Sequence, residues 1–220
     1  MSVETCLSAI GSYIQAKGFT YPKGMIENFY LSMKSKPFVI LAGTSGTGKT
    51  RLVKLFAEAI GAQYKMVSAR PDWSDSSDLF GHTDLNGVFI PGEILGFIHA
   101  AKDNPDIPHI LCLDEMNLAR VEYYFSDYLS IIETRDIQET HIVSMPLVSE
   151  SLYGRDEYAK LKYGEMGFPE NLYLIGTVNM DETTFPFSKK VLDRANTIEF
   201  DYVDLMAGFP DKITVAPLQL

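Results

Sequence analysis

The sequence predicts an α/β fold in which a parallel β-sheet is covered by helices on both faces. Short apolar runs that fit buried strands alternate with stretches in which apolar residues recur every three or four positions, as in amphipathic helices. A glycine-rich turn joins the first apolar run to a helical stretch. The 220 residues, 46% of them hydrophobic, suffice for one domain with a substantial core and exclude a disordered chain.

The first part of the chain is expected to contain two helices, a strand and a third helix. Helical spacing of apolar residues predicts the first two helices over 3–17 and 24–34. Consecutive apolar residues at 38–42 predict a strand that is buried on both faces, as strands of a parallel sheet are. After the glycine-rich turn, residues 52–60 again have helical spacing, and Gly61 ends that helix.

The second part continues the alternation around two insertions. A strand at 64–67 precedes a polar insertion at 69–92, in which Asn86-Gly87 indicates a hairpin turn. The second insertion, 140–170, is loop-rich from residue 149 onward. The other expected elements are a helix at 92–102, a buried strand at 109–113, a long helix at 118–132, a hairpin strand at 142–148 and strands at 172–178 and 198–202. We therefore expect N-terminal helices at 1–36 and an α/β core at 37–203.

Composition excludes several classes of function. Against 19 Lys and Arg stand 29 Asp and Glu, a net charge of -10, whereas a nucleic-acid-binding surface needs concentrated positive charge. The apolar runs are far too short to span a membrane, and no secretory signal is recognisable, so we expect a cytoplasmic protein. Cys6 and Cys112 cannot form a disulfide framework, and the four histidines have no metal-ligand spacing.

The strongest functional motif is a phosphate-binding loop of the form G-x-x-x-x-G-K-[ST]. It comprises Gly43, Thr44, Ser45, Gly46, Thr47, Gly48, Lys49 and Thr50. Its glycines let backbone amides surround phosphate groups at the start of the following helix. Lys49 is expected to reach the outer phosphates, and the Thr50 hydroxyl to bind Mg²⁺. The loop therefore predicts binding of a nucleoside triphosphate, ATP or GTP, together with Mg²⁺.

Two acids follow the predicted strand at 109–113. Asp114 and Glu115 lie at its carboxyl end, where ligands bind in open α/β sheets. With the phosphate loop upstream, Asp114 is predicted to hold Mg²⁺ and Glu115 to act as the base that activates a water molecule. The alternative is a strand that ends in two solvated acids. Cys112, inside the apolar strand, is interpreted as a core residue and not as a nucleophile.

These motifs resemble those of a known family. The loop GTSGTGKT, the run at 113–135 and the run at 176–200 look like the AAA+ module of McrB-type proteins, which are nucleotide-driven motor subunits of modification-dependent restriction systems. The pattern of Asp114, Glu115 and Asn117 is shared with MoxR-like ATPases. The resemblance extends over residues 29–200 and implies a P-loop NTPase (AAA+) fold with a five-stranded parallel sheet in the order 5-1-4-3-2.

The resemblance also implies two catalytic residues further along the chain. Asn179, after the strand at 172–178, corresponds to a polar sensor between the attacking water and the terminal phosphate; taken alone, it is an ordinary turn residue. Arg194 matches the region that presents an arginine finger to a neighbouring subunit, and a permanently charged, planar guanidinium suits phosphate. The alternative for Arg194 is a surface salt bridge with Asp193 or Glu199.

Two departures from the family leave the nucleotide base open. Better-known McrB proteins, which use GTP, have an Asp and an Arg where this chain has Glu182 and Thr183. The usual run of adjacent arginines after the last helix is reduced to Arg194. ATP and GTP are therefore both candidate substrates, and the segment 21–25 is expected to contribute to the choice between them.

Trp73, close to Arg70 in the first insertion, has two interpretations. An exposed Trp beside an Arg could stack on a base or anchor a partner. We favour the other interpretation, a Trp packed beneath a long loop.

The preferred function is Mg²⁺-dependent NTP binding and hydrolysis by the motor module of an McrB-like DNA restriction machine. The resemblance implies a ring, expected to be a hexamer, and an McrC-like nuclease partner. The acidic charge implies that other domains or chains contact DNA. The alternatives are a MoxR-like ATPase that remodels protein partners and a nucleotide-switched assembly module with little turnover. Residues 204–220 are expected to be the truncated start of a helical lid or a tail.

Overall fold

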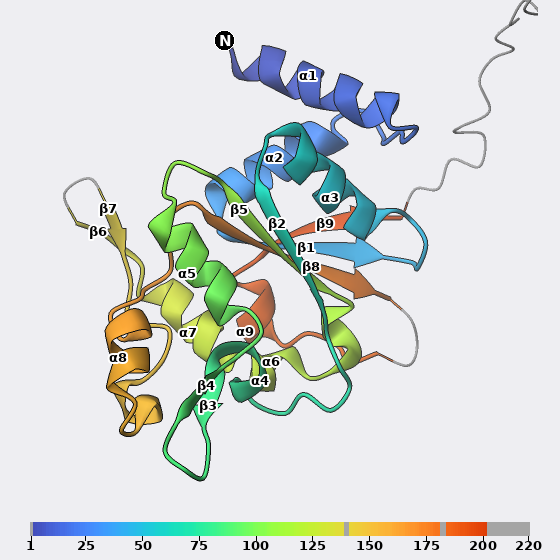
Figure 1. The fold of residues 1–220 in the computed structure, drawn as a ribbon. Coiled ribbons are helices and arrows are strands. Elements are labelled where there is room, and N and C mark those ends of the chain that lie inside the picture. The colour runs from blue at the N-terminus through green and yellow to red at the C-terminus, as the bar shows by residue number, and fades with distance from the viewer. Residues whose placement is uncertain (1, 139–140, 181–183, 202–220) are drawn as a thin grey trace, which may run out of the picture.

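The computed structural model describes residues 2–138, 141–180 and 184–201. Its centre is a sheet of five parallel strands (Figure 1). The strands are β1 (Phe38–Gly43), β2 (Gln63–Ser68), β5 (His109–Asp114), β8 (Leu172–Asn179) and β9 (Asn196–Phe200). Their order is β2-β5-β8-β1-β9. When these five are counted along the chain and the sheet is followed from β9, the order is 5-1-4-3-2, which confirms the prediction.

The carboxyl ends of the five strands meet at one edge of the sheet. The register places Gly43, at the end of β1, opposite Asn179 on β8 and Phe200 on β9. Further along the sheet, Asp114 at the end of β5 lies opposite Ser68 at the end of β2. Because all strands run in the same direction, the loop after β1, Asp114 and Asn179 converge at this edge.

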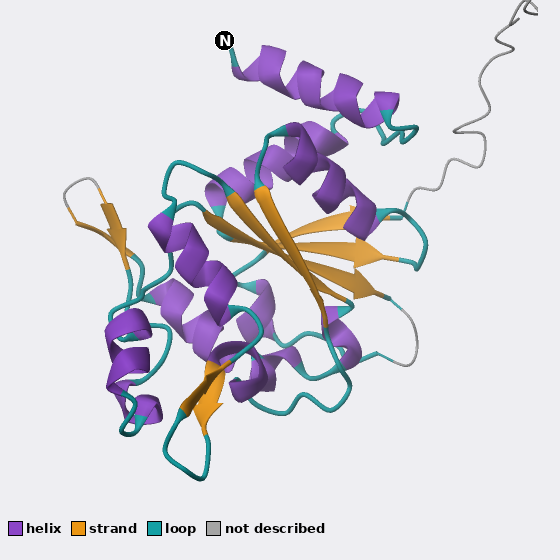
Figure 2. Ribbon diagram, viewed as in Figure 1, coloured by secondary structure: helices purple, strands orange, loops and turns teal. Residues whose placement is uncertain are grey.

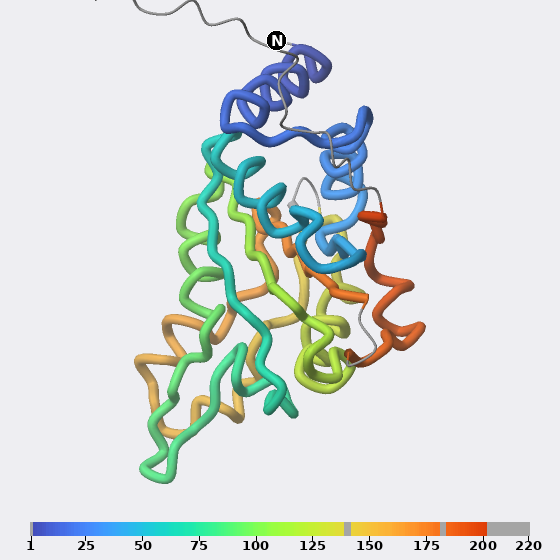
Figure 3. The backbone as a smooth tube through the Cα atoms, turned by 90° about the vertical axis from the view of Figure 1, so that its right-hand side faces the viewer, coloured from blue at the N-terminus to red at the C-terminus, as the bar shows by residue number. Residues whose placement is uncertain are grey.

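A layer of three helices lies on one face of the sheet, with the first of them packed on the other two. They are α1 (Val3–Ala16), α2 (Met25–Ser35) and α3 (Lys49–Ala59). Val39 and Leu41 of β1 point to this face and share a buried cluster with Phe29 of α2 and Phe56 of α3. The rings of Phe29 and Phe56 meet edge to face, with centroids 5.0 Å apart. Figure 3 shows α1 at the end of the molecule opposite the green β-hairpin that follows α4 (Ser77–Phe80).

The remaining helices cover the other face, so the prediction of helices on both sides is confirmed (Figure 2). They include α4 (Ser77–Phe80), α5 (Leu95–Asp103), α6 (Val121–Tyr124), α7 (Ser126–Glu133) and α9 (Lys189–Leu192). Phe38 of β1 packs among the aromatic rings of Phe125 and Tyr128. Trp73 is only 3% exposed and packs against Tyr124, which confirms the interpretation as a packed residue.

The single long helix predicted over 118–132 is wrong. The chain here forms a 3₁₀ turn, η1 (Met116–Leu118), followed by the two short helices α6 and α7. Ala119 is extended, and Phe125 leaves helical geometry with φ of -111° and ψ of 7°. A long side chain helps to hold this shape, because the Tyr124 hydroxyl donates to the Met116 carbonyl at 2.8 Å. The apolar spacing is helical, but tertiary contacts divide the helix.

Both insertions fold into small elements that pack on each other. They contain the hairpin β3 (Gly81–Thr83) with β4 (Phe89–Pro91), the strand β7 (His141–Val143), η2 (Glu150–Tyr153) and α8 (Glu157–Tyr163). The strand β7 pairs with β6 (Asp136–Gln138), which precedes the second insertion. The hairpin expected at Asn86-Gly87 is confirmed, whereas the strand expected over 142–148 ends at Val143. The Thr83 hydroxyl donates to the Leu152 carbonyl, which joins the first insertion to the second.

The predictions for the end of the chain lie partly outside the described residues. The strand expected over 198–202 is observed as β9 and ends at Phe200. The lid or tail segment at 204–220, together with Glu182 and Thr183, falls outside the described residues. Where the structure is described, no helix combines the length and apolar character needed to cross a membrane.

Candidate nucleotide-binding site

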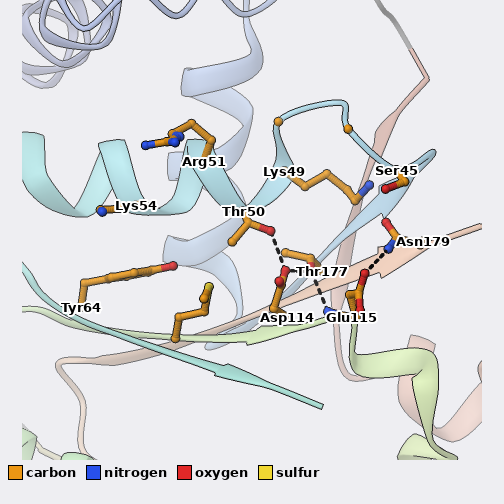
Figure 4. Close-up of a pocket in the computed structure, with 13 residues that line it drawn as sticks. Ser45, Lys49, Thr50, Arg51, Lys54, Tyr64, Asp114, Glu115, Thr177 and Asn179 are labelled. Carbon is orange, nitrogen blue, oxygen red and sulfur yellow. Dashed lines mark hydrogen bonds between the residues drawn. The ribbon is translucent and has the colours of Figure 1, made fainter. Parts of the chain in front are cut away.

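A cavity of about 530 Å³ opens at the carboxyl edge of the sheet, beside the loop that follows β1 (Figure 4). Side chains and backbone from the loop, α3 and three strands line it. The lining residues are Ser45, Gly46, Gly48, Lys49, Thr50, Arg51, Lys54, Tyr64, Met66, Asp114, Glu115, Thr177 and Asn179. The structure thus brings together the phosphate loop, the acidic pair and Asn179, which are far apart in the sequence.

The loop has the backbone and the charge needed to hold phosphate groups. Gly46 and Gly48 have φ values of 79° and 87°, in the left-handed region where side chains are strained. Lys49 is buried, and its ammonium donates to the carbonyls of Gly43 at 3.0 Å and Thr44 at 2.6 Å. The loop therefore holds a cation at the start of α3, a helix whose N-terminal amides also attract anions.

Three residues of the predicted loop do not line the cavity but support the Lys49 side chain. Gly43 belongs to β1, and its carbonyl and that of Thr44 accept hydrogen bonds from Lys49. The Thr47 hydroxyl lies 3.4 Å from the Lys49 ammonium and donates to the Thr44 carbonyl at 3.0 Å. Ser45, Gly46, Gly48, Lys49 and Thr50 are thus the loop residues that face the cavity.

Thr50 and Asp114 are in direct contact. The Thr50 hydroxyl donates to Oδ1 of Asp114 at 2.5 Å. A hydroxyl and a carboxylate are oxygen donors of the kind that Mg²⁺ prefers, and Mg²⁺ is commonly held by one or two carboxylates together with substrate phosphates. No group of three or more His, Cys, Asp or Glu that could hold a metal occurs among the described residues. The donor set therefore fits Mg²⁺ carried by a nucleotide better than a site enclosed by protein ligands alone.

Glu115 and Asn179 also contact each other. Nδ2 of Asn179 donates to Oε1 of Glu115 at 2.9 Å. Glu115 has φ of 52° and is, within the described part of the chain, the only residue other than glycine with a positive φ. Its backbone amide donates to the Thr177 hydroxyl at 3.0 Å, and this hydroxyl donates to Oδ1 of Asp114 at 2.6 Å.

Sequence reasoning missed Thr177. The signal was its position two residues before Asn179 on the same strand, because alternate side chains of a strand point to one face. Thr177 is 2% exposed, so its hydroxyl had to find partners inside the protein.

Arg194 does not line the cavity in this chain. Its side chain is only 15% exposed, and its guanidinium forms an ion pair with Glu133 of α7. It also donates to the carbonyls of Leu129 at 3.1 Å and Lys190 at 2.5 Å. Arg194 lowers the pKa of the Glu133 carboxyl through a hydrogen bond and its positive charge. The expected arginine-finger role stays a prediction, and the observed ion pair is with Glu133 instead of the expected Asp193 or Glu199.

The segment 21–25, which is expected to influence the choice of nucleotide base, begins with a residue that contacts the phosphate loop. The Tyr21 hydroxyl donates to the Gly48 carbonyl at 3.0 Å. Burial raises the pKa of Tyr21 to about 12, although the nearby positive charge of Arg51 opposes the shift. Arg51 packs over the ring of Phe19 at 5.0 Å. Tyr21 is therefore a neutral hydrogen-bond donor at physiological pH, and the selection of ATP or GTP stays a prediction.

Cys112 has no nucleophilic character. Its thiol is fully buried in β5, and burial together with the negative charge of Asp114 raises its pKa to about 12. The interpretation of Cys112 as a core residue is confirmed.

The sheet order, the loop after β1 and the acids after β5 define a P-loop nucleotide-binding core. A family model described as AAA domain (dynein-related subfamily) matches residues 38–195, and the chain belongs to this AAA family. The resemblance expected from the motifs is thereby confirmed.

Two kinds of curated protein are similar to this chain. The chain is 27% identical to the Type IV methyl-directed restriction enzyme EcoKMcrB subunit of Escherichia coli (strain K12), over 86% of this chain and 39% of that protein. It is 31% identical to the Lon protease of Metamycoplasma arthritidis and 32% identical to Lon protease 2 of Thermus thermophilus, over 47% and 46% of this chain and 12% of each protease. The chain thus spans well under half the length of these relatives.

Proposed function

We propose that this chain binds a nucleoside triphosphate with Mg²⁺ and hydrolyses it, as the motor module of an McrB-like DNA restriction machine. The observation that carries the proposal is the convergence of Lys49, Thr50, Asp114, Glu115 and Asn179 on one cavity. A module that only binds nucleotide needs neither a carboxylate base nor a polar side chain bonded to it, so the pair Glu115–Asn179 favours hydrolysis.

The loop and Lys49 supply the phosphate-binding half of the site. Backbone amides from Ser45 to Gly48 and the N-terminus of α3 provide donors, and the Lys49 ammonium provides a positive charge. Thr50 and Asp114 would hold Mg²⁺, which when bound neutralises charge on the phosphate oxygens.

Glu115 and Asn179 supply the hydrolytic half. The Glu115 carboxylate accepts a proton from a water molecule whose oxygen forms the new bond to the terminal phosphorus. The bond from that phosphorus to the oxygen of the departing nucleoside diphosphate breaks in the same step. The Asn179 amide orients Glu115 through the 2.9 Å hydrogen bond and is expected to contact the terminal phosphate.

The restriction context rests on the likeness to the McrB subunit, which extends over most of this chain. In that context we propose a ring, a hexamer, in which Arg194 acts on the nucleotide of a neighbour, and an McrC-like nuclease partner. With a net charge of -10, the chain is proposed to leave contact with DNA to other domains or chains, and to work in the cytoplasm. The likeness to Lon proteases favours the alternative, a protein-remodelling ATPase, but it extends over only about half of the chain.

Two substitutions separate binding from hydrolysis. We expect Lys49→Ala to lose nucleotide binding, because it removes the cation at the phosphate loop. We expect Glu115→Gln to bind nucleotide as the wild type does but to release almost no phosphate, because an amide cannot accept the proton. Binding is measured by titration of fluorescent ATP and GTP analogues with Mg²⁺, and turnover by phosphate release. The two titrations also decide between ATP and GTP.

A matched variant controls for the change of charge. Glu27→Gln alters an exposed glutamate on α2, outside the cavity, and should leave both measurements at the wild-type value. Wild-type turnover in Glu115→Gln would show that Glu115 is not the base. Addition of the protein encoded beside this chain then tests the restriction context, since a nuclease partner should stimulate turnover.

A further inference from the structure

The Thr177 hydroxyl lies between the two acidic residues of the site and bonds to both (Figure 4). It donates a hydrogen bond to Oδ1 of Asp114 at 2.6 Å and accepts one from the backbone amide of Glu115 at 3.0 Å. A threonine hydroxyl has one hydrogen to donate and lone pairs to accept, so one group satisfies both contacts. With the side chain 2% exposed, water is a poor substitute for either contact.

Thr177 is the first residue of β8 beyond its backbone pairing with β5. The register between these strands runs from His109 opposite Leu172 to Leu113 opposite Gly176. After β5 ends at Asp114, the backbone amide of Glu115 donates to the Thr177 side chain of β8. The hydroxyl thus extends the attachment of the acidic turn to β8 after the strand has ended.

The residue that donates this hydrogen bond to Thr177 is also the strained residue of the turn. Glu115 has φ of 52° and ψ of 42°, a left-handed conformation that costs free energy for any residue with a side chain. Such conformations persist only where the surrounding structure holds them. Two contacts hold Glu115 from β8: Thr177 binds its amide, and Asn179 binds its carboxylate.

The same hydroxyl restricts Asp114. Oδ1 of Asp114 accepts hydrogen bonds from both Thr50 and Thr177, which fixes the rotation of the carboxylate. Thr177 is therefore the side chain that contacts both the carboxylate that would hold Mg²⁺ and the turn that carries the base.

We propose that Thr177 is a positioning residue that fixes Asp114 and the strained Glu115 relative to each other, and so aligns the base with the bound phosphate. The inference rests on the proposed hydrolytic function. Thr177 touches neither reacting atom, and its effect passes through the two acids. Its removal should therefore lower the rate of the chemical step more than the affinity for nucleotide.

The test compares Thr177→Val with Thr177→Ser in the full chain. Valine keeps the shape and the β-branched stem but has no hydroxyl, whereas serine keeps the hydroxyl. We expect Thr177→Val to lower kcat by about 100-fold, the size of effect that a small misplacement of a catalytic group produces. KM and the affinity for a fluorescent nucleotide should stay close to wild type, and Thr177→Ser should recover most of kcat. Thr197→Val, on the exposed side of β9, is the matched control and should behave as wild type.

Hydrogen exchange gives a second measurement that does not need turnover. In wild type and Thr177→Ser the Glu115 amide is bonded to the hydroxyl and should exchange slowly, whereas Thr177→Val should speed its exchange without changing exchange in β1. Thr177→Ala removes the same hydroxyl and serves if the valine variant does not fold.

The two measurements separate failure of this inference from failure of the proposed function. If the wild type hydrolyses nucleotide and Thr177→Val has the same kcat, Thr177 does not position the site. A wild type without turnover would refute the proposed function, and exchange alone would then decide the role of Thr177. Equal exchange of the Glu115 amide in all variants would refute the inference, and faster exchange in the valine variant would support it.

Discussion

Two glycines of the phosphate loop are required for different physical reasons. A Cβ on Gly43 would lie 2.2 Å from the carbonyl oxygen of Phe200, because β9 runs directly beside the end of β1. A Cβ on Gly46 would meet nothing within 4 Å, but the φ of 79° there is unfavourable for any side chain. Gly43 therefore serves the packing of the sheet, and Gly46 serves the shape of the loop.

This difference predicts opposite defects for two alanine substitutions. We expect Gly43→Ala to destabilise the fold by about 1–3 kcal/mol or more, because backbone of β9 must move to avoid an overpacked contact. We expect Gly46→Ala to cost only about 1–2 kcal/mol of local strain but to weaken nucleotide binding strongly, because the loop must change shape. Thermal unfolding and nucleotide titration of both variants test the prediction.

Gly96→Ala is the matched control. Gly96 lies in α5, is exposed and has open space around it, so alanine should leave the stability unchanged or raise it slightly. Weaker nucleotide binding with an unchanged melting temperature in Gly43→Ala would contradict the assignment of Gly43 to sheet packing.

The turn after β5 also depends on single residues of β8. A Cβ on Gly176 would lie 2.0 Å from Sδ of Met116, which is fully buried above it. Asn117 donates to the Asn179 carbonyl at 2.8 Å. Together with Thr177, these contacts make β8 the template on which the acidic turn is shaped.

At the scale of elements, the contact between α7 and the segment after α9 determines what Arg194 can do. Glu133 at the end of α7 forms the ion pair with Arg194, and the Leu129 carbonyl of the same helix accepts a hydrogen bond from it. A guanidinium held in this way must be released from Glu133 before it can reach the phosphates of a neighbouring chain.

The proposed arginine finger therefore predicts different outcomes for the two partners. We expect Arg194→Ala to lower turnover at protein concentrations where the chain assembles, and to leave nucleotide affinity unchanged. We expect Glu133→Ala to keep or raise turnover, because it frees the guanidinium. Phosphate release is measured across a range of protein concentrations. Equal losses of turnover in both variants would show that Arg194 acts by holding α7 and not across subunits.

The elements that could be predicted from sequence are those whose signal is local. The strands β1, β5 and β8 are buried on both faces and therefore appear as continuous apolar runs. The phosphate loop is a contiguous motif, so its residues could be assigned before the fold was known.

The features that escaped prediction depend on residues distant in sequence. The break between η1, α6 and α7 contains neither Gly nor Pro, and it reflects contacts such as that of Asn117 with the end of β8. The partner of Arg194 is Glu133, which no nearby sequence pattern indicates. Thr177 was missed because a buried threonine in an apolar strand looks like an ordinary β-former. Such contacts follow from strand order and register, which appear only in the folded chain.

At the scale of the whole molecule, the nucleotide cavity and the two insertions are separate. The cavity is lined by residues of the loop, α3, β2, β5 and β8 and of the turn after β5. The insertions instead join each other, with the Phe89 ring packed between Tyr153 and Tyr163 at centroid distances of 5.0 and 6.1 Å. Segments far apart in the chain thus form one unit (Figure 1), and its three rings belong to the same buried cluster as the helices on that face of the sheet.

Asp156 links the two insertions through its carboxylate. Its Oδ1 accepts a hydrogen bond from the Ala159 amide at 2.9 Å and so caps α8. Its Oδ2 accepts a hydrogen bond from the Phe89 amide of the other insertion at 3.2 Å. One carboxylate therefore satisfies backbone donors in both insertions, and its loss should leave two amides without these partners.

We expect Asp156→Ala to lower the free energy of unfolding by about 1–2 kcal/mol, from loss of a helix cap and of a hydrogen bond between the insertions. For a chain of this size, that corresponds to a fall in melting temperature of roughly 2–8 °C. Asp156→Asn keeps an acceptor oxygen for the cap and should lose less. Nucleotide affinity should stay at the wild-type value in both variants, because none of the described residues that line the cavity comes from either insertion. A fall in affinity that parallels the fall in stability would show instead that the insertions and the nucleotide site are energetically coupled.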